Sequence, residues 1–176
     1  MKKNFLIILT SIFFFVLLIF LYLLTVERNP SELPSNLLNK KVPEFKTDSL
    51  LANEIFISAN EFGNEVVLVN FFATWCVPCR KEHKFIQRFS TNEKIKIIGI
   101  NYKDKSKNTI RWLNSLGNPY AKIAIDKKGK IAIDWGVYGI PETFIVDSNG
   151  IIKYRHVGPI TKNIYNKITS LIREIK

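Results

Sequence analysis

The two cysteines of the chain, Cys76 and Cys79, are separated by two residues and are its most reactive side chains. A disulfide between them would close too small a loop to join distant elements, so the spacing indicates redox chemistry rather than a structural cross-link. In thiol–disulfide exchange one thiolate attacks the disulfide of a partner, and a second thiol then resolves the mixed disulfide. The spacing therefore predicts a redox-active pair.

Three other roles for the two thiols would leave different signs in the sequence. Buried structural thiols would lie inside an element, whereas Cys76 falls between a predicted strand and a predicted helix. A c-type haem attachment site needs a histidine directly after the second cysteine, and that residue is Arg80. His83 and His156 could complete a zinc or copper site, but His156 is remote and the sequence has no second C-x-x-C. We therefore expect no metal and no other cofactor, and a solvated position for His83.

The elements around the pair explain why it would be reactive. Residues 65–73 (EVVLVNFFA) form a nearly continuous β-branched and aromatic run, which is typical of a strand buried on both faces. Residues 78–91 are apolar on one side, which predicts a helix. Cys76 would then lie at the helix N-cap, where unpaired backbone N–H groups and the helix dipole favour a thiolate. We expect Cys76 to be the more exposed, attacking thiol and Cys79 the deeper, resolving one.

The remaining patterns predict a mixed sheet with helices on both faces. No G-x-G-x-x-G or G-x-x-x-x-G-K-[ST] loop is present in the sequence, so nucleotide binding has no support. Residues 130–135 fit a strand or a short helix equally well. The other expected strands are 54–58, 94–101, 121–126, 142–147 and 151–157, and the other expected helices are 106–116 and a last one capped by Thr161.

Length and charge narrow the class of protein further. A chain of 176 residues with 47% hydrophobic side chains suits one domain with an appendage and is too apolar for a disordered protein. The net charge of +11 comes from lysines that are scattered along the chain rather than gathered in one basic run. We therefore expect no nucleic-acid partner, although an anionic partner or a phospholipid surface remains compatible with the charge.

The N-terminal region contains a long uncharged apolar segment, residues 5–24. A helix of about 20 residues matches the thickness of the hydrocarbon core of a bilayer, so this segment predicts a transmembrane anchor. A cleaved signal peptide is the main alternative, but its apolar core is shorter and is followed by small residues at the cleavage site. Here the run ends in Leu24-Thr25-Val26-Glu27, which lacks that pattern.

The flanking charges predict the orientation of the anchor. Lys2 and Lys3 precede it, which places residues 1–4 in the cytoplasm by the positive-inside rule and sends the rest of the chain across the membrane. In a bacterium that side is the periplasm, where thiols meet oxidising machinery. Residues 25–41 are expected to form a linker, and residues 42–176 a compact domain.

Longer segments of the sequence resemble a known family. Residues 70–76 (NFFATWC), followed by Cys79-Arg80-Lys81-Glu82-His83, are similar to the active-site region of thioredoxin-fold oxidoreductases. Three further segments are similar to the cytochrome c biogenesis thiol:disulfide interchange proteins, the CcmG/DsbE family: 116–120 (LGNPY), 136–144 (GVYGIPETF) and 150–156 (GIIKYRH). The resemblance spans about residues 38–160 and extends to the N-terminal anchor.

This resemblance implies a thioredoxin-like α/β fold, with a mixed central sheet flanked by helices, behind a transmembrane anchor helix in the inner membrane. It implies a protein-disulfide reductase that keeps the C-x-x-C-H cysteines of apocytochrome c as thiols for haem attachment. The implied partners are apocytochrome c or a haem-ligation thiol protein, and a membrane electron donor of the CcdA/DsbD type. A tethered thioredoxin-like reductase with broader substrates and a Cys/His metal-handling module stay open as alternatives.

The resemblance also assigns catalytic roles to residues around the pair. Cys76 would be the nucleophile and Cys79 the resolving thiol. Glu82 and Glu142 match acidic residues near the pair, where a carboxylate would oppose the thiolate and could accept the proton of Cys79. The alternatives are a solvated helix charge for Glu82 and a strand-edge residue for Glu142.

Substrate contacts are implied for Trp75, Ile140 and Pro141, with Pro141 preceded by a cis peptide bond. The sequence departs from thioredoxin at Asn70, because thioredoxin carries a buried aspartate at that position as a proton acceptor. The Val77-Pro78 dipeptide also differs from the Pro-Thr that is frequent between the cysteines in this family, and this dipeptide tunes the reduction potential.

Overall fold

The computed structural model describes residues 2–25, 37–51 and 55–175. The chain divides into two compact units, residues 1–30 and 31–176, and each is described by itself. The first contains helix α1 (Lys2–Thr25), whose described side chains are all exposed. Residues 4–25 form the one helix of the described chain that is long and apolar enough to cross a membrane. Most of the predicted linker, residues 26–36, lies outside the described residues.

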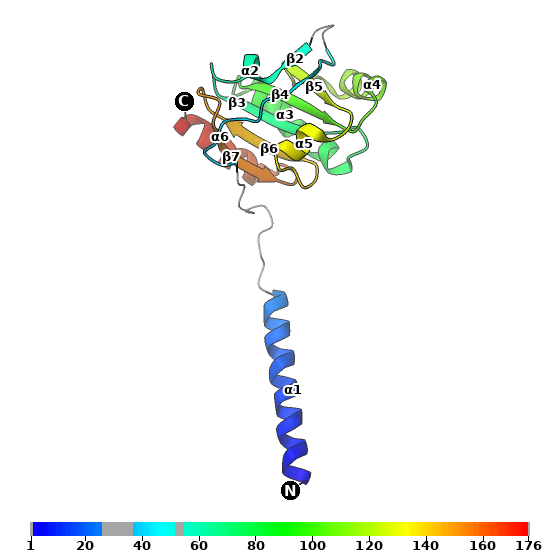
Figure 1. Ribbon diagram of the computed structural model, residues 1–176, viewed down its shortest axis with the longest axis vertical. Coiled ribbons are helices and arrows are strands. Elements are labelled where there is room, and N and C mark those ends of the chain that lie inside the picture. The colour runs from blue at the N-terminus through cyan, green and yellow to red at the C-terminus, as the bar shows by residue number, and fades with distance from the viewer. Residues whose placement is uncertain (1, 26–36, 52–54, 176) are drawn as a thin grey trace. The chain divides into compact units, whose positions relative to one another are not determined.

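The second unit is built on a five-stranded sheet with the order β5-β4-β3-β6-β7, which can be followed in Figure 1. Strands β3, β4 and β5 are parallel, while β6 and β7 run antiparallel to their neighbours. The mixed sheet expected from the sequence is confirmed. The strands are β3 (Val67–Phe72), β4 (Lys96–Tyr102), β5 (Lys122–Asp126), β6 (Glu142–Val146) and β7 (Ile152–Val157).

The helices and a small hairpin cover the two faces of this sheet. The hairpin pairs β1 (Lys46–Asp48) with β2 (Ile55–Ile57) in antiparallel register, and β2 is followed by the short helix α2 (Ser58–Glu61). The remaining helices are α3 (Val77–Thr91), α4 (Ser106–Leu116), α5 (Lys130–Asp134) and α6 (Lys162–Ile175).

Strand β3 is buried at every position because the sheet has a hydrophobic core on each face. Leu68 and Phe72 belong to the core that includes residues of α3, α4 and α6. Val69 and Phe71 belong to the opposite core, which includes Phe56 of β2, residues of α5 and Trp135. This two-sided burial explains the continuous apolar run in the sequence. It also anchors the strand whose end leads into the cysteine pair.

The structure decides two local points, the conformation of residues 130–135 and the place of residues 39–41. Residues 130–135, which fitted a strand or a helix, contain the short helix α5, and the carboxylate of Asp126 accepts a hydrogen bond from Ala132 N at 2.9 Å. Residues 39–41, placed in the linker from the sequence, hydrogen-bond to the β7 end of the sheet. Asn39 N donates to Ile152 O, and Ile152 N donates to Lys40 O. These residues therefore pack with the compact unit.

Candidate active site

The cysteine pair lies between the end of β3 and the first turn of α3. Cys76 is the N-cap of α3, with an extended backbone, and its Sγ accepts a hydrogen bond from Cys79 N at 3.1 Å. The two sulfurs form a disulfide across a Cα–Cα distance of 5.3 Å. The exposed fractions are 5% for Cys76 and 2% for Cys79, so the predicted difference in exposure has the expected sign but is small.

Exposed apolar side chains lie next to Cys76 in the chain and in the loop that leads to Ile140. Trp75 and Val77 flank Cys76 and are 57% and 64% exposed, and Tyr138 is 70% exposed. The carbonyl oxygen of Ile140 lies 3.7 Å from Cys76 Sγ, and the Ile140–Pro141 peptide bond is cis. Trp75 and the Ile140 carbonyl thus lie directly beside the first cysteine.

The loop that carries Trp75 is held by residues from the end of β4. The carboxylate of Asp104 accepts from Thr74 N at 2.6 Å and from Thr74 Oγ1 at 3.1 Å. The indole Nε1 of Trp75 donates to Lys103 O at 3.2 Å. These bonds fix the backbone just before Cys76 while leaving the Trp75 ring at the surface.

Glu82 follows Cys79 by one helical turn and is fully buried, with 1% of its surface exposed. Its Oε1 accepts from Asn70 Nδ2 at 2.9 Å, and its Oε2 accepts from Ile160 N at 2.8 Å. Burial raises the pKa of Glu82 to about 7, and the two hydrogen bonds oppose that rise only in part. The alternative of a solvated helix charge is therefore wrong.

Asn70 connects Glu82 to two further buried polar side chains. Tyr120 OH donates to Asn70 Oδ1 at 2.9 Å, and Asn70 Nδ2 also reaches Thr143 Oγ1 at 3.1 Å. Burial, and then the charge of Glu82, raise the pKa of Tyr120 well above its usual value. From the sequence, Asn70 is notable only as a departure from the thioredoxin aspartate, and Tyr120 and Thr143 carry no predicted role. The signal that could have indicated them is the polar Asn70 inside an apolar strand, which needs a buried partner.

Close packing places Tyr120 over this network. The ring of Tyr120 stacks on Phe72 with centroids 4.6 Å apart. Both rings lie against the backbone of Gly99 on β4, where a Cβ would come within 2.8 Å of Phe72 and 3.0 Å of Tyr120. Glycine is therefore needed at position 99 for Tyr120 to reach Asn70.

Glu142, the other acidic residue carried over from the family, has a different environment. It is fully buried and forms an ion pair with Arg155 on β7, at 2.8 Å between Oε2 and Nε. Its Oε1 accepts from Tyr138 N at 2.8 Å and from Gly139 N at 3.4 Å. The alternative of a strand-edge residue is thus wrong, because β6 lies between β3 and β7 in the sheet and Glu142 is buried.

Arg155 supports the same loop from a second direction. Its Nη2 donates to Gly136 O at 2.9 Å, and its guanidinium lies 4.6 Å from the centre of the Tyr138 ring. Arg155 and Glu142 together bind residues 136–139, which lead into the Ile140 carbonyl beside Cys76. Arg155 was not identified from the sequence, because nothing local to it indicates a buried ion pair.

The two histidines do not join the cysteines in a shared site. His83 is buried, its Nε2 lies 2.9 Å from Gly117 O and its ring lies 4.3 Å from that of Trp112, so the expected solvated position is wrong. Burial lowers its pKa, and the nearby Arg80 lowers it further against the effect of the Gly117 carbonyl. His156 lies on β7 with Nε2 3.4 Å from Pro159 O. The described residues contain no group of three or more His, Cys, Asp or Glu that could hold a metal ion.

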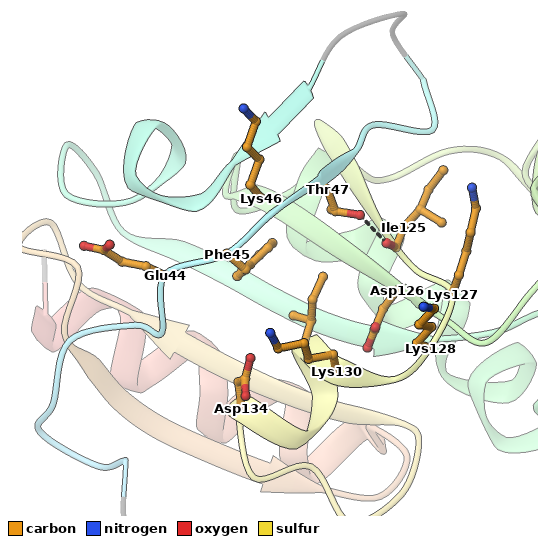
Figure 2. A pocket seen from close by; sticks show the side chains of 11 residues that line it. Glu44, Phe45, Lys46, Thr47, Ile125, Asp126, Lys127, Lys128, Lys130 and Asp134 are labelled. Carbon is orange, nitrogen blue, oxygen red and sulfur yellow. Dashed lines mark hydrogen bonds between the residues drawn. The ribbon is translucent and has the colours of Figure 1, made fainter.

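A separate hollow of about 290 Å³ lies between β1, the end of β5 and α5 (Figure 2). Thr47 Oγ1 donates to Ile125 O at 2.6 Å across it. Its rim carries both signs of charge, and none of its lining residues belongs to the cysteine site. The charged lining residues are Glu44, Lys46, Asp126, Lys127, Lys128, Lys130 and Asp134.

Comparisons with known proteins agree with this geometry. The family model described as Redoxin matches residues 37–169. The thiol:disulfide interchange protein DsbE of Escherichia coli (strain K12) is 42% identical over 140 residues, which cover 79% of this chain and 75% of that protein. The thiol:disulfide interchange protein CycY of Rhizobium leguminosarum bv. viciae is 42% identical over 134 residues, covering 76% and 72%.

The solved structures support the fold. The crystal structure of a protein described as a thiol:disulfide interchange protein DsbE from Chlorobium tepidum superposes with a TM-score of 0.69 at 22% identity, covering 82% of this chain and 100% of that one. The redox-active spacing of Cys76 and Cys79, the thioredoxin-like sheet and the curated relatives therefore lead to one conclusion. The chain is a disulfide oxidoreductase of the Redoxin family and belongs to its DsbE group of thiol:disulfide interchange proteins.

Proposed function

We propose that the protein reduces the C-x-x-C-H disulfide of apocytochrome c, or of a haem-ligation thiol protein, so that haem can be attached. The observation that carries the proposal is the placement of Cys76 at the N-cap of α3, beside the exposed Trp75 and the Ile140 carbonyl. The similarity of residues 136–144 to the cytochrome c biogenesis proteins supports this substrate over a broader set.

In the proposed reaction the reduced enzyme starts with a Cys76 thiolate. It attacks one sulfur of the substrate disulfide, whose S–S bond breaks and whose other sulfur leaves as a thiolate and takes up a proton. The Cys79 thiolate then attacks the Cys76 sulfur, which forms the Cys76–Cys79 disulfide and releases the second substrate thiol. Two electrons pass to the substrate, and a dithiol donor of the CcdA/DsbD type in the membrane returns two electrons to the pair.

Glu82 is the proposed acceptor of the Cys79 proton. A general base works best when its pKa is close to the working pH, and burial gives Glu82 a pKa of about 7. It lies one helical turn beyond Cys79 and its orientation is fixed by Asn70 and Ile160. In thioredoxin the strand itself supplies the base, as an aspartate. Here Asn70 takes that place in the strand and instead orients a base that belongs to the helix, Glu82.

Glu142 is proposed to position the substrate-binding loop rather than to transfer protons. Its oxygens are engaged by the Arg155 guanidinium and by two backbone N–H groups of residues 138–139. Both carboxylate oxygens therefore already accept hydrogen bonds from groups of the chain itself. Its interactions instead support the loop that leads to Ile140 and Pro141, the proposed substrate contacts.

Helix α1 is proposed to anchor the enzyme in the inner membrane as a single span that is not cleaved. The positive charges of Lys2 and Lys3 favour a cytoplasmic N-terminus, which leaves the catalytic unit in the periplasm. Membrane fractionation followed by protease treatment of spheroplasts tests this arrangement. The full-length chain should stay with the membranes after alkaline washing, and protease should digest the catalytic unit. A protected catalytic unit would contradict the proposed orientation.

Deleting the gene tests the proposed function. Haem staining of the deletion strain should show loss of c-type cytochromes, and an added small thiol should restore them because it can reduce the same disulfide. Normal cytochrome levels, together with oxidised thiols on many periplasmic proteins, would favour the broader-substrate reductase instead.

A further inference from the structure

A second hollow, of about 350 Å³, lies directly beside the cysteine pair, between the first turn of α3 and helix α4. Thr74 precedes Cys76 by two residues, and Arg80 is one helical turn beyond Cys76, where its backbone N–H donates to Cys76 O at 3.3 Å. The hollow is therefore lined in part by residues that flank the cysteine pair in the chain. Its lining residues are Thr74, Arg80, Asn108, Arg111, Trp112 and Ser115.

The two arginines of this α3–α4 groove carry charge without a carboxylate partner. Among the residues that the structure describes, no ion pair involves Arg80 or Arg111, whereas Arg155 and Arg173 each pair with a glutamate. Arg80 lies 5.9 Å from the centre of the Trp112 ring. Arg111 donates through Nη2 to Asn108 Oδ1 at 2.9 Å, which orients its guanidinium and leaves its other N–H groups available.

One acidic group beside the groove, the carboxylate of Asp104, is already engaged. Asp104 accepts hydrogen bonds from Thr74 N and Oγ1 and from Lys105 N, so its charge is used in holding the loop before Trp75. The side chains that line the groove are themselves either positively charged or uncharged. A carboxylate placed there would meet two guanidinium groups, the pairing that such forks favour.

We propose that the α3–α4 groove binds an acidic side chain of the polypeptide whose disulfide Cys76 attacks. This inference rests on the proposed reductase function and adds a preference to it: substrates with an aspartate or glutamate close to the target cysteine bind better. The occupant follows from charge complementarity, because two cations line a groove that includes residues flanking the cysteine pair. The other hollow, shown in Figure 2, is lined by both lysines and carboxylates, whose charges largely offset each other.

The test uses three peptides that each contain an intramolecular C-x-x-C disulfide and differ at one neighbouring residue, which is Glu, Gln or Lys. The reduced full-length protein in detergent micelles is assayed for kcat/KM with each. An exposed ion pair strengthens binding by up to about fivefold. The glutamate of the peptide would face two arginines at once, so kcat/KM for the Glu peptide should exceed that for the Gln peptide by about fivefold. Added salt should reduce the ratio.

A charge reversal separates the groove from general attraction. Arg111→Glu should remove the preference for the Glu peptide and favour the Lys peptide instead. Lys107→Glu makes the same change in net charge at an exposed residue of α4 that does not line the groove, so it should keep the wild-type order. A substitution at Arg80 is less suitable as the main test because Arg80 directly follows Cys79.

The other possible outcomes distinguish a failure of the groove proposal from a failure of the proposed reductase function. Equal and rapid reduction of all three peptides by the wild type would overturn the groove proposal and leave the reductase function intact. Loss of the preference in Lys107→Glu as strongly as in Arg111→Glu would show that net charge is responsible, which also overturns it. Failure to reduce any of the peptides would overturn both proposals.

Discussion

Asn70 on β3 donates a hydrogen bond to Glu82 on α3 across 2.9 Å, and both side chains are buried. The amide orients the carboxylate without adding a second negative charge. The same amide also contacts Tyr120 and Thr143, so four polar side chains share one buried network. The network gives the Glu82 carboxylate a fixed place inside an otherwise apolar core, where burial raises its pKa to about 7.

Glu82→Gln should change how stability depends on pH. Because the pKa of Glu82 rises from 4.5 to about 7 on folding, the folded chain binds more protons than the unfolded chain between these values. The wild type should therefore lose stability, by roughly 3 kcal/mol, as the pH rises from 4.5 to 7. Urea unfolding across this range should show a slope that Glu82→Gln removes.

The same substitution should also flatten the pH profile of turnover. Glu82 must be ionised to accept the Cys79 proton, so the wild-type rate of resolution should rise through pH 7 and the variant should lack that inflection. Glu174→Gln, the same change at an exposed helical glutamate, is the matched control. A wild-type inflection that persists in Glu82→Gln would assign the proton to another group.

Asn70→Asp should raise the pKa of the buried acidic group further. Two carboxylates 2.9 Å apart cannot both ionise, so the variant holds a shared proton to higher pH than the wild type does. We expect a variant that is less stable at pH 8 than the wild type and close to it at pH 5. Thermal unfolding at both pH values measures the difference, and a larger loss at pH 5 would contradict the shared proton.

Cys76→Ser and Cys79→Ser should separate the two thiols. Cys76→Ser should abolish reduction, because the nucleophile at the helix N-cap is removed. Cys79→Ser should accumulate a mixed disulfide with the substrate, since the resolving thiol is gone. Mass spectrometry under non-reducing conditions detects the adduct. An adduct with Cys76→Ser and none with Cys79→Ser would reverse the two roles.

Glu142→Gln should destabilise the chain strongly. The side chain of Arg155 is 3% exposed, and loss of its carboxylate partner leaves a buried, uncompensated charge, at a cost of about 3–5 kcal/mol. The double variant Glu142→Gln/Arg155→Met should recover part of this stability, because neither charge is then buried alone. A cycle of urea unfolding experiments measures the coupling.

The kinetics of two Glu142 variants test the proposed positioning role of this residue. An amide oxygen can still accept from Tyr138 N, so Glu142→Gln should keep kcat near that of the wild type, while Glu142→Ala should raise KM by loosening residues 136–139. The conservative variant thus rescues the function that the truncated one loses. A loss of kcat by the same factor in both variants would instead mark Glu142 as a proton-transfer group.

The cysteine site could be located from the sequence because its determinants are local. The apolar run of β3 and the one-sided pattern of α3 depend on side-chain periodicity, and together they place Cys76 at a helix N-cap. The apolar segment 5–24 likewise contains in one stretch all that predicts a membrane-spanning helix. These features hold whichever elements later pack around them.

Only the tertiary structure decided which polar residues are buried, and with which partners. Glu82 could have been a solvated helix charge until Ile160, 78 residues away, supplied its backbone donor and excluded water. His83 lies against Trp112 for the same reason, and the buried charge of Glu142 is paired with Arg155 on the neighbouring strand. Burial of a charge is a property of the elements that pack over it, and periodicity along one element cannot report which distant segment will cover it.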